Sequence, residues 1–188
     1  MIRKGYKIIT IFMLLVMSSV SISYSQTLNS SEYKWLVEPQ FDFVKNFSDE
    51  LALVIIDGKI GYINTNGNFE IKPQFDSTSS FSEGLAAAKK DNKWGFINKK
   101  GIFVISPEFD DAWSFSEGLA IVRQNGKHGF INKNGKVVIP LQFREARSFS
   151  GGLAAVMNER YWGFIDKNGK TVINFKIESY NINDFFNG

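Results

Sequence analysis

A period of 34 residues runs through the chain and constrains its fold more than any other feature of the sequence. Four phenylalanines open the segments FSDELALV, FSEGLAAA, FSEGLAIV and FSGGLAAV: Phe47, Phe81, Phe115 and Phe149. Glycines at 61, 95, 129 and 163, and again at 67, 101, 135 and 169, keep the same spacing. An uninterrupted period of this length is typical of tandem structural repeats, which bury their apolar faces on one another. We therefore define four repeats, 47–80, 81–114, 115–148 and 149–182.

Each repeat has the pattern of a three-stranded antiparallel meander. The first strand begins with the Leu-Ala pair, and the second is IGYI, WGFI, HGFI or WGFI. Asp57-Gly58 is a tight hairpin dipeptide between these two strands. Asn64, followed three residues later by Gly67, is typical of a type I turn with a bulge before the third strand. We expect proline to end the third strand, because proline has no N–H to extend a ladder; these prolines are Pro73, Pro107 and Pro140.

These strands predict an all-β fold in which tandem three-stranded antiparallel meander repeats stack into an elongated, twisted array. A propeller-like closed ring is the alternative. The ring is less favoured, because a propeller blade usually has four strands in about 40–45 residues. No stretch after the N-terminal segment has the period and the caps of a helix.

The period also predicts which positions are buried. Leu51 and its equivalents 85, 119 and 153 should point into the core. Ala52 and its equivalents 86, 120 and 154 lie on the opposite face, where an alanine in every repeat indicates a close approach of neighbouring layers. The glycine in the middle of each second strand, Gly61 in the first repeat, predicts a bulge or an aromatic ring lying over the backbone.

Residues 1–25 have the pattern of a secretory signal peptide. Three basic residues precede an apolar run from Ile8 to Val16, and Ser23 and Ser25 supply the small residues of a cleavage site. Cleavage after Ser25 predicts an exported protein, periplasmic or extracellular. An uncleaved membrane anchor is the less favoured alternative, because the apolar run is short against the roughly 20 residues of a membrane span.

The remaining ends depart from the repeat. Residues 26–46 are predicted to be a linker and a partial repeat that caps the array, because Trp35 and Phe41 occupy the slots that Phe69 and Phe75 hold in the first repeat. Residues 183–188 are predicted to be a C-terminal tail. The polar residues around Asn181 are typical of a cap over a last strand edge.

The formal net charge of +3 comes from the three basic residues of the N-terminal segment. Without them, 19 basic residues balance 19 acidic ones. A neutral chain lacks the electrostatic signature of a nucleic-acid-binding protein, so no nucleic-acid partner is predicted. The membrane is predicted as a partner only through the signal segment, if that segment stays uncleaved.

The recurring FSEGLA and WGFIN segments resemble those of the WG-repeat proteins, also described as KWG repeats. The dipeptide that gives the family its name stands here as Trp94-Gly95 and Trp162-Gly163, with Ile60-Gly61 and His128-Gly129 in the other two repeats. The resemblance covers about residues 33–180. It implies a β-repeat architecture of the kind common in bacterial proteins, and it implies no catalytic activity and no functional residue.

No catalytic residue, cofactor or metal site is predicted, and the chain is not expected to be an enzyme. It has no cysteine, and its one histidine, His128, occupies an aromatic slot of the repeat, which argues against a thiolate- or histidine-rich zinc site. The glycine-rich segment after Gly163 has one residue too many for a phosphate-binding loop. Asp49, Glu83 and Glu117 are repeat copies at turn positions, which is typical of solvated turn residues.

Three tryptophans are the candidate binding contacts: Trp113, Trp94 and Trp162. Trp94 and Trp162 share a recurring slot with His128, and such a row can equally belong to the core. Trp113 stands where the other repeats have lysine, serine and arginine, so we expect it to be exposed.

Two functions remain open from the sequence. The first is a non-catalytic, exported module that binds an unidentified protein through the extended face of the array. The alternative is a module that binds a glycan or the cell envelope. A row of exposed aromatic rings at the repeat spacing would favour the glycan, and a contiguous patch of mixed polar and apolar residues would favour the protein. A pocket that joined His128 to a carboxylate would favour an enzyme.

Overall fold

The computed structural model describes residues 41–177. The predicted signal peptide 1–25, residues 26–40 of the predicted cap and the predicted tail 183–188 lie outside the described residues. Between residues 41 and 177 the chain forms fifteen strands and no helix, hence no helix long and apolar enough to cross a membrane.

The strands form four antiparallel sheets, in which the strand order follows the chain. The first sheet contains β1 (Phe43–Val44), β2 (Leu51–Ile56), β3 (Lys59–Asn64) and β4 (Phe69–Phe75). The second contains β5 (Leu85–Lys90), β6 (Lys93–Asn98) and β7 (Phe103–Phe109). The third contains β8 (Asp111–Ala112), β9 (Leu119–Gln124), β10 (Lys127–Asn132) and β11 (Val137–Phe143). The fourth contains β12 (Glu145–Ala146), β13 (Leu153–Met157), β14 (Trp162–Asp166) and β15 (Thr171–Ile177).

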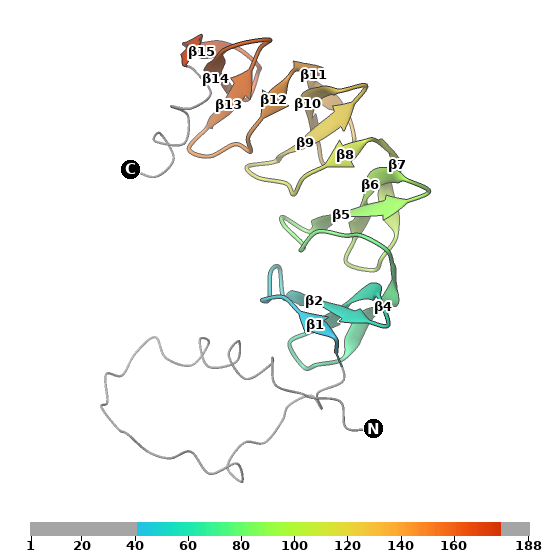
Figure 1. Cartoon of the computed structure of the whole chain (residues 1–188). Helices are drawn as coiled ribbons and strands as arrows, with labels where there is room; N and C mark the ends of the chain where they lie inside the picture. The colour runs from blue at the N-terminus through green and yellow to red at the C-terminus, as the bar shows by residue number, and fades with distance from the viewer. Residues whose placement is uncertain (1–40, 178–188) are drawn as a thin grey trace, which may run out of the picture.

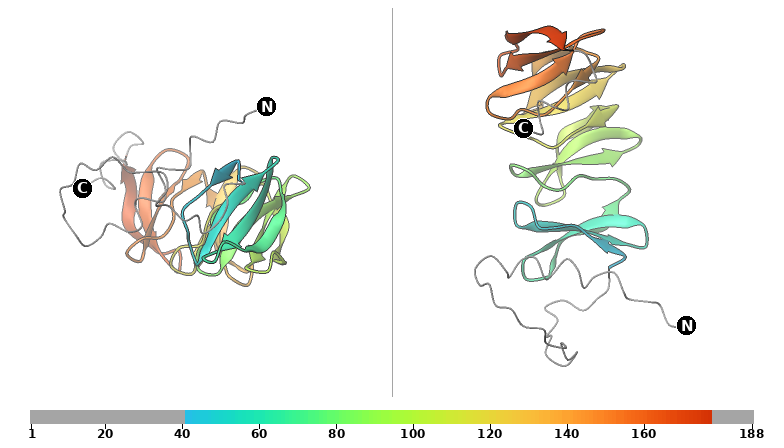
Figure 2. Two further views of the ribbon diagram at one scale, coloured as in Figure 1. Left: turned by 90° about the horizontal axis from the view of Figure 1, so that it is seen from below. Right: turned by 60° about the vertical axis from the view of Figure 1, so that its left-hand side comes forward.

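The sheets follow one another along an open curve, whose concave side lies to the left in Figure 1. The second view of Figure 2 shows them one above the other, from the blue first sheet to the red last one. The prediction of an all-β stacked array is therefore confirmed, and the four described sheets do not close into a ring.

The core lies between consecutive sheets. Tyr62, Phe96 and Phe130 each pack against the phenylalanine that opens the next repeat, with ring centroids 4.8, 4.9 and 5.0 Å apart. The alanines of the Ala52 row are fully buried, as predicted, and Ala86 packs with the core of the first sheet. The leucines of the Leu51 row are buried in the first three repeats, whereas Leu153 is only half-buried, because no fifth sheet is present among residues 41–177 to cover it.

Each repeat adds a short strand to the predicted meander. This strand is β1, β8 or β12 in three sheets, and a single bridge between Thr78 and Ala88 in the second. Two residues are too few for a hydrophobic period to reveal a strand. Asp110 alone separates β7 from β8, so the chain passes from one sheet directly into the next.

The prediction that proline ends the third strand is wrong. β4, β7 and β11 continue through Pro73, Pro107 and Pro140. These are edge strands, where the missing N–H leaves no ladder position empty. The predicted bulge is confirmed, because the register shifts beside the glycine of each second strand. In the last repeat the ring of Phe175 also lies over Gly163, 3.1 Å from where a Cβ would stand.

Candidate binding surface

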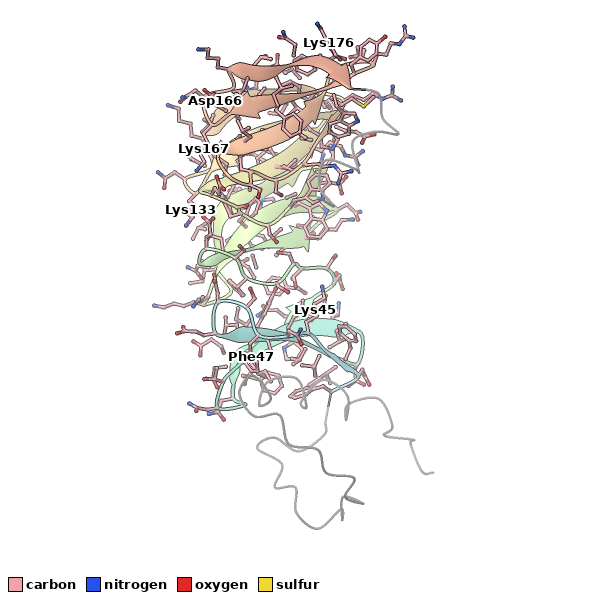
Figure 3. All side chains as sticks on the ribbon, turned by 90° about the vertical axis from the view of Figure 1, so that its left-hand side faces the viewer. Lys45, Phe47, Lys133, Asp166, Lys167 and Lys176 are labelled. Carbon is pink, nitrogen blue, oxygen red and sulfur yellow. The ribbon has the colours of Figure 1, made fainter. Side chains whose placement is uncertain are left out.

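The acidic residues of the F-S-E-G turns hold neighbouring repeats together. Glu83 accepts a hydrogen bond from the backbone N–H of Gly118 at 3.1 Å and forms an ion pair with Lys133 at 3.1 Å. Glu117 does the same with Gly152 and Lys167, at 3.0 and 3.1 Å. The hydrogen bond from Lys167 is the main reason why the pKa of Glu117 lies below its ordinary value. We call these contacts the inter-repeat bridges. Figure 3, which looks at the concave side of the curve, shows Lys133 and Lys167 one above the other along one margin of the array.

The serine of the same turn adds a second contact. Ser48, Ser82 and Ser116 each donate a hydrogen bond, at 2.7 to 2.8 Å, to the carbonyl of the phenylalanine that opens the next repeat. The acidic residue that follows has a positive φ, of 51° at Asp49 and 54° at Glu83. A non-glycine residue in this conformation is uncommon. The turn is therefore held in a strained shape that directs its carboxylate at the neighbouring repeat.

A further ion pair, at the other end of the strands, links the second sheet to the residue that leads into the third sheet. Lys93 contacts Asp110 at 2.6 Å, and this contact is the main cause of the lowered pKa of Asp110. In the next repeat Arg144 stands where Asp110 would be, and Lys127 pairs instead with Glu159. The lysine thus keeps an acidic partner, which here comes from the following repeat.

The first and the last repeat depart from these bridges at single positions. Thr65 stands in the first repeat where the later ones have Lys99, Lys133 and Lys167. Gly151 stands in the last repeat where the others have an acid, and Tyr161 replaces the lysine of the second ion pair. The recurring charged residues therefore serve the stacking of the repeats.

One further row of side chains holds a different residue in each of the four sheets. It consists of Lys45, Ser79, Trp113 and Arg147, which we call the variable row. Lys45, Trp113 and Arg147 are exposed, and Ser79 is half-buried. Each member follows the short first strand of its sheet or the corresponding bridge. β8 of the third sheet lies against β6 of the second, and β12 of the fourth sheet lies in the same way against β10 of the third.

Trp113 is 41% exposed, as predicted. Its ring lies 5.4 Å from that of His128, at an angle of 50°. Arg123 and Asp111 form an ion pair on the same sheet. The Nδ1 atom of His128 and the Nε atom of Arg123 are buried and have no hydrogen-bond partner among residues 41–177.

The other two candidate tryptophans lie in the core or at its margin. Trp94 is half-buried and packs against the cluster between the second and third sheets. Trp162 is only 3% exposed and packs with Met157 and Phe164, and the guanidinium of Arg147 lies 5.8 Å from the centroid of its ring. The three tryptophans therefore do not form one exposed row.

Two cationic side chains that were not predicted lie beside aromatic rings. Arg147 lies over Trp162, and Arg160 lies over Tyr161 at 5.1 Å. Arg160 and Tyr161 are neighbours in the sequence, which was the only available signal. In the part of the chain that the structure describes, no three His, Cys, Asp or Glu side chains gather in a way that could hold a metal ion.

A family model described as "WG containing repeat" matches the sequence five times, over residues 34–59, 60–94, 94–127, 129–160 and 162–188. A search of curated proteins finds no match.

Solved structures that are similar to this one share little sequence with it. Hsv2 of Kluyveromyces lactis, in a form with loop 6CD replaced by a Gly-Ser linker, is 11% identical, with a TM-score of 0.46 over 65% of this chain and 46% of that one. The present chain thus covers less than half of Hsv2. A plant lectin with two metal binding sites from Cicer arietinum is 10% identical, with a TM-score of 0.32 over 75% of this chain and 94% of the lectin.

Proposed function

The chain belongs to the WG containing repeat family, and from this premise we propose that it is an exported, non-catalytic module that binds another protein through its variable row. The row lies on a scaffold whose constant residues are already engaged between repeats. Repeat proteins commonly bind through such extended surfaces, since a stacked scaffold can vary the exposed positions without disturbing the stacking.

The exposure of Trp113 is the observation that carries the proposal. An exposed tryptophan on the same sheet as an ion pair is typical of the anchor residues of protein interfaces. The Trp113 side chain gains more from burial against a partner than any other member of the row, because it has the largest apolar area.

The arrangement of the tryptophans favours a protein over a glycan. A sugar chain would be expected to stack on several exposed rings at the repeat spacing. Trp94 and Trp162 pack instead with the core clusters of the array, and Trp113 lies in a patch that mixes an ion pair with aromatic rings.

Export is part of the proposal and rests on the pattern of residues 1–25. We expect the mature chain to begin at Gln26 and to be recovered from the periplasm or the medium. N-terminal sequencing of the protein from each cell fraction tests this. An intact N-terminus in the cytoplasmic fraction would contradict export without touching the binding proposal.

Tryptophan quenching and affinity capture test the binding surface together. The emission of each tryptophan is obtained as the difference between wild type and its Trp→Phe variant. Iodide should quench the emission of Trp113 more strongly than that of Trp94 or Trp162. Immobilised mature chain should then retain a protein from the cell-envelope fraction that Trp113→Ser does not retain. Lys45→Ser changes the same slot in the first sheet, where Ile60 stands at the position of His128, and serves as the matched control.

Two outcomes would reject the proposal. Equal capture by wild type, Trp113→Ser and Lys45→Ser would show that the row is not the contact. If cell-wall glycan protected Trp113 from iodide while no protein was retained, the glycan would be the ligand.

A further inference from the structure

The third strand of each repeat forms the sheet edge opposite to the variable row. Between the first and second sheets, Phe103 reaches across the gap at this edge, and its ring lies 6.3 Å from that of Phe75 at an angle of 86°. The position of Phe103 holds Val137 in the next repeat and Thr171 in the last one. The side chain that fills the gap therefore becomes smaller along the array.

An open groove of about 310 Å³ lies between the third and fourth sheets, where Thr171 stands. Phe143 and Ile165 line it and are buried in the core between these sheets, and Phe175 packs against the same core. Gln142 and Thr171 are exposed and add a carboxamide and a hydroxyl to the lining. An apolar floor with a few polar groups is typical of small-molecule sites, and the volume lies at the lower end of their range.

The other two polar side chains of the lining are engaged within the chain. Asn158 accepts hydrogen bonds from two backbone N–H groups of its own turn. Glu159 forms an ion pair with Lys127, so its charge is already balanced and the groove favours a neutral ligand. Within residues 41–177, no hydrogen bond involves the side chain of Gln142 or Thr171, so both can pair with a ligand.

We propose that this groove binds a small, neutral aromatic compound that carries a hydroxyl group, of the phenol class. The gap between the first and second sheets shows which group fits, because the ring of Phe103 fills it there. A ligand ring would lie against Phe143, the equivalent of Phe75, in the edge-to-face arrangement that aromatic rings prefer. Its hydroxyl would pair with Gln142 and Thr171, since a phenol both donates and accepts a hydrogen bond.

A small molecule is a better match for the groove than a protein. Stable protein interfaces bury about 800 Å² on each partner, far more than a groove of this volume offers. The inference is independent of the proposed function, since the variable row and the groove lie at opposite edges of the fourth sheet. Trp113→Ser should therefore abolish the capture of a protein and leave the groove unchanged.

Fluorine NMR of 4-fluorophenol tests the inference. The fluorine signal should broaden in a saturable way when the mature chain is added. The dissociation constant should be on the order of 1 mM, because so small a ligand has few atoms to contribute. Phenol should compete for the groove. Cyclohexanol should compete less than phenol, because its ring is thicker and lacks the edge-to-face attraction.

Thr171→Phe supplies the ring that the groove lacks and should abolish the broadening. Val172→Phe is the matched control, because Val172 is 54% exposed and does not line the groove. The same ring placed there should leave the affinity within a factor of about two. Thr171→Val keeps the shape of the side chain but removes its hydroxyl, and should weaken binding about threefold. Circular dichroism of each variant checks that the array remains folded.

The inference fails if 4-fluorophenol shows no saturable broadening, or if Thr171→Phe and Val172→Phe behave alike. Loss of the broadening in Trp113→Ser would place the ligand at the variable row and overturn the inference. A capped Gly-Tyr-Gly peptide that binds much more tightly than phenol would assign the groove to a side chain of a partner protein instead. Binding that appears only after Phe185→Ser and Phe186→Ser would assign the groove to the C-terminal residues of the chain itself.

Discussion

At the scale of single residues, the choice of side chain is most restricted where the second strand of a repeat meets the third. A Cβ at Gly95 would lie 2.4 Å from the carbonyl oxygen of Ile105 and 2.7 Å from the nitrogen of Pro107. Both atoms belong to the backbone, so no side chain can turn away to make room. The glycine that gives WG repeats the second half of their name is thus required by the bulge, whichever residue precedes it.

Gly95→Ala is therefore expected to lower the free energy of unfolding by about 3 kcal/mol or more, since the two strands must separate locally. Gly58→Ala is the control. Gly58 has a φ of 74° and open space around it, so its substitution costs only the backbone strain of about 1–2 kcal/mol. Urea unfolding followed by circular dichroism measures both. Equal losses would show that the close approach carries no special cost.

Tyr62 allows a second prediction at this scale. Its hydroxyl lies 2.6 Å from Thr78 Oγ1 and 2.7 Å from the carbonyl oxygen of Ser79, and it can donate a hydrogen bond to either. Burial raises the pKa of Tyr62 to about 12. A raised pKa in the folded state means that the protonated phenol stabilises the fold fully below the ordinary pKa of 10.0. This stabilisation is lost as the pH rises from about 10 to about 12.

Wild type should accordingly be more stable than Tyr62→Phe at neutral pH, by about 1 kcal/mol. Between pH of about 9 and about 12 it should lose up to about 2 kcal/mol more than the variant. Unfolding curves at both pH values test the sign. The other titrating groups are common to both proteins and cancel in the difference. A difference that stays constant with pH would contradict a raised pKa of Tyr62.

At the scale of strands and turns, the F-S-E-G segment contributes more than its own turn. Its serine, its acid and the phenylalanine before them each contact the next or the preceding repeat. Recurrence in the sequence thus records contacts between repeats as well as the fold of each repeat.

Glu117→Gln tests the inter-repeat bridges through pH. The pKa of Glu117 is lowered, mainly by its hydrogen bond with Lys167. Its stabilising effect is therefore present above the ordinary pKa of glutamate and is lost as the pH falls below it. The variant should lose less stability than wild type between pH of about 6 and about 3.

Glu70→Gln is the control for that experiment, because Glu70 is an exposed residue of β4 outside the bridges. Its thermal unfolding should follow wild type across the same pH range. If both variants behaved alike, the acid sensitivity would come from general charge repulsion and not from the bridges.

Much of the element scale could be predicted, because the 34-residue spacing repeats each strand and turn four times. The short strands β1, β8 and β12 escaped prediction, since two residues carry no period. The passage of β4 through Pro73 depends on that strand being an edge, which only the assembled sheet shows. The burial of Trp162 against Met157 depends likewise on the packing of the last sheet. The exposure of Trp113 could be predicted, because the equivalent positions hold lysine, serine and arginine.

At the scale of the whole molecule, the main strand contacts between sheets in residues 41–177 join consecutive sheets, such as those of β4 with β5 and of β10 with β12. Such an array is expected to unfold as coupled units whose cooperativity depends on each interface. Phe115 is 2% exposed and lies in the cluster between the second and third sheets, so it tests the central interface.

Phe115→Ala should cost about 3–5 kcal/mol through the cavity that it leaves. It should also lower the urea m-value, because the two halves then unfold separately. Trp113→Ala, two residues earlier and exposed, should cost less than about 1 kcal/mol and keep the wild-type m-value. Denaturation followed by circular dichroism separates the two effects. An unchanged m-value in Phe115→Ala would show that the array remains one cooperative unit.

The unmatched ends of the array bear on how such a protein changes length during evolution. Gly84 and Gly118 donate the same hydrogen bond to the acids of successive repeats, Asp49 and Glu83, so excising one internal period would join residues that already fit. Duplication of an internal period would likewise extend the array with every bridge satisfied. Copies of the first or last repeat would bring Thr65 or Gly151 into the interior, where a bridge would be missing. New repeats are therefore expected to arise by duplication of internal repeats, while the first and the last repeat stay at the two ends of the array.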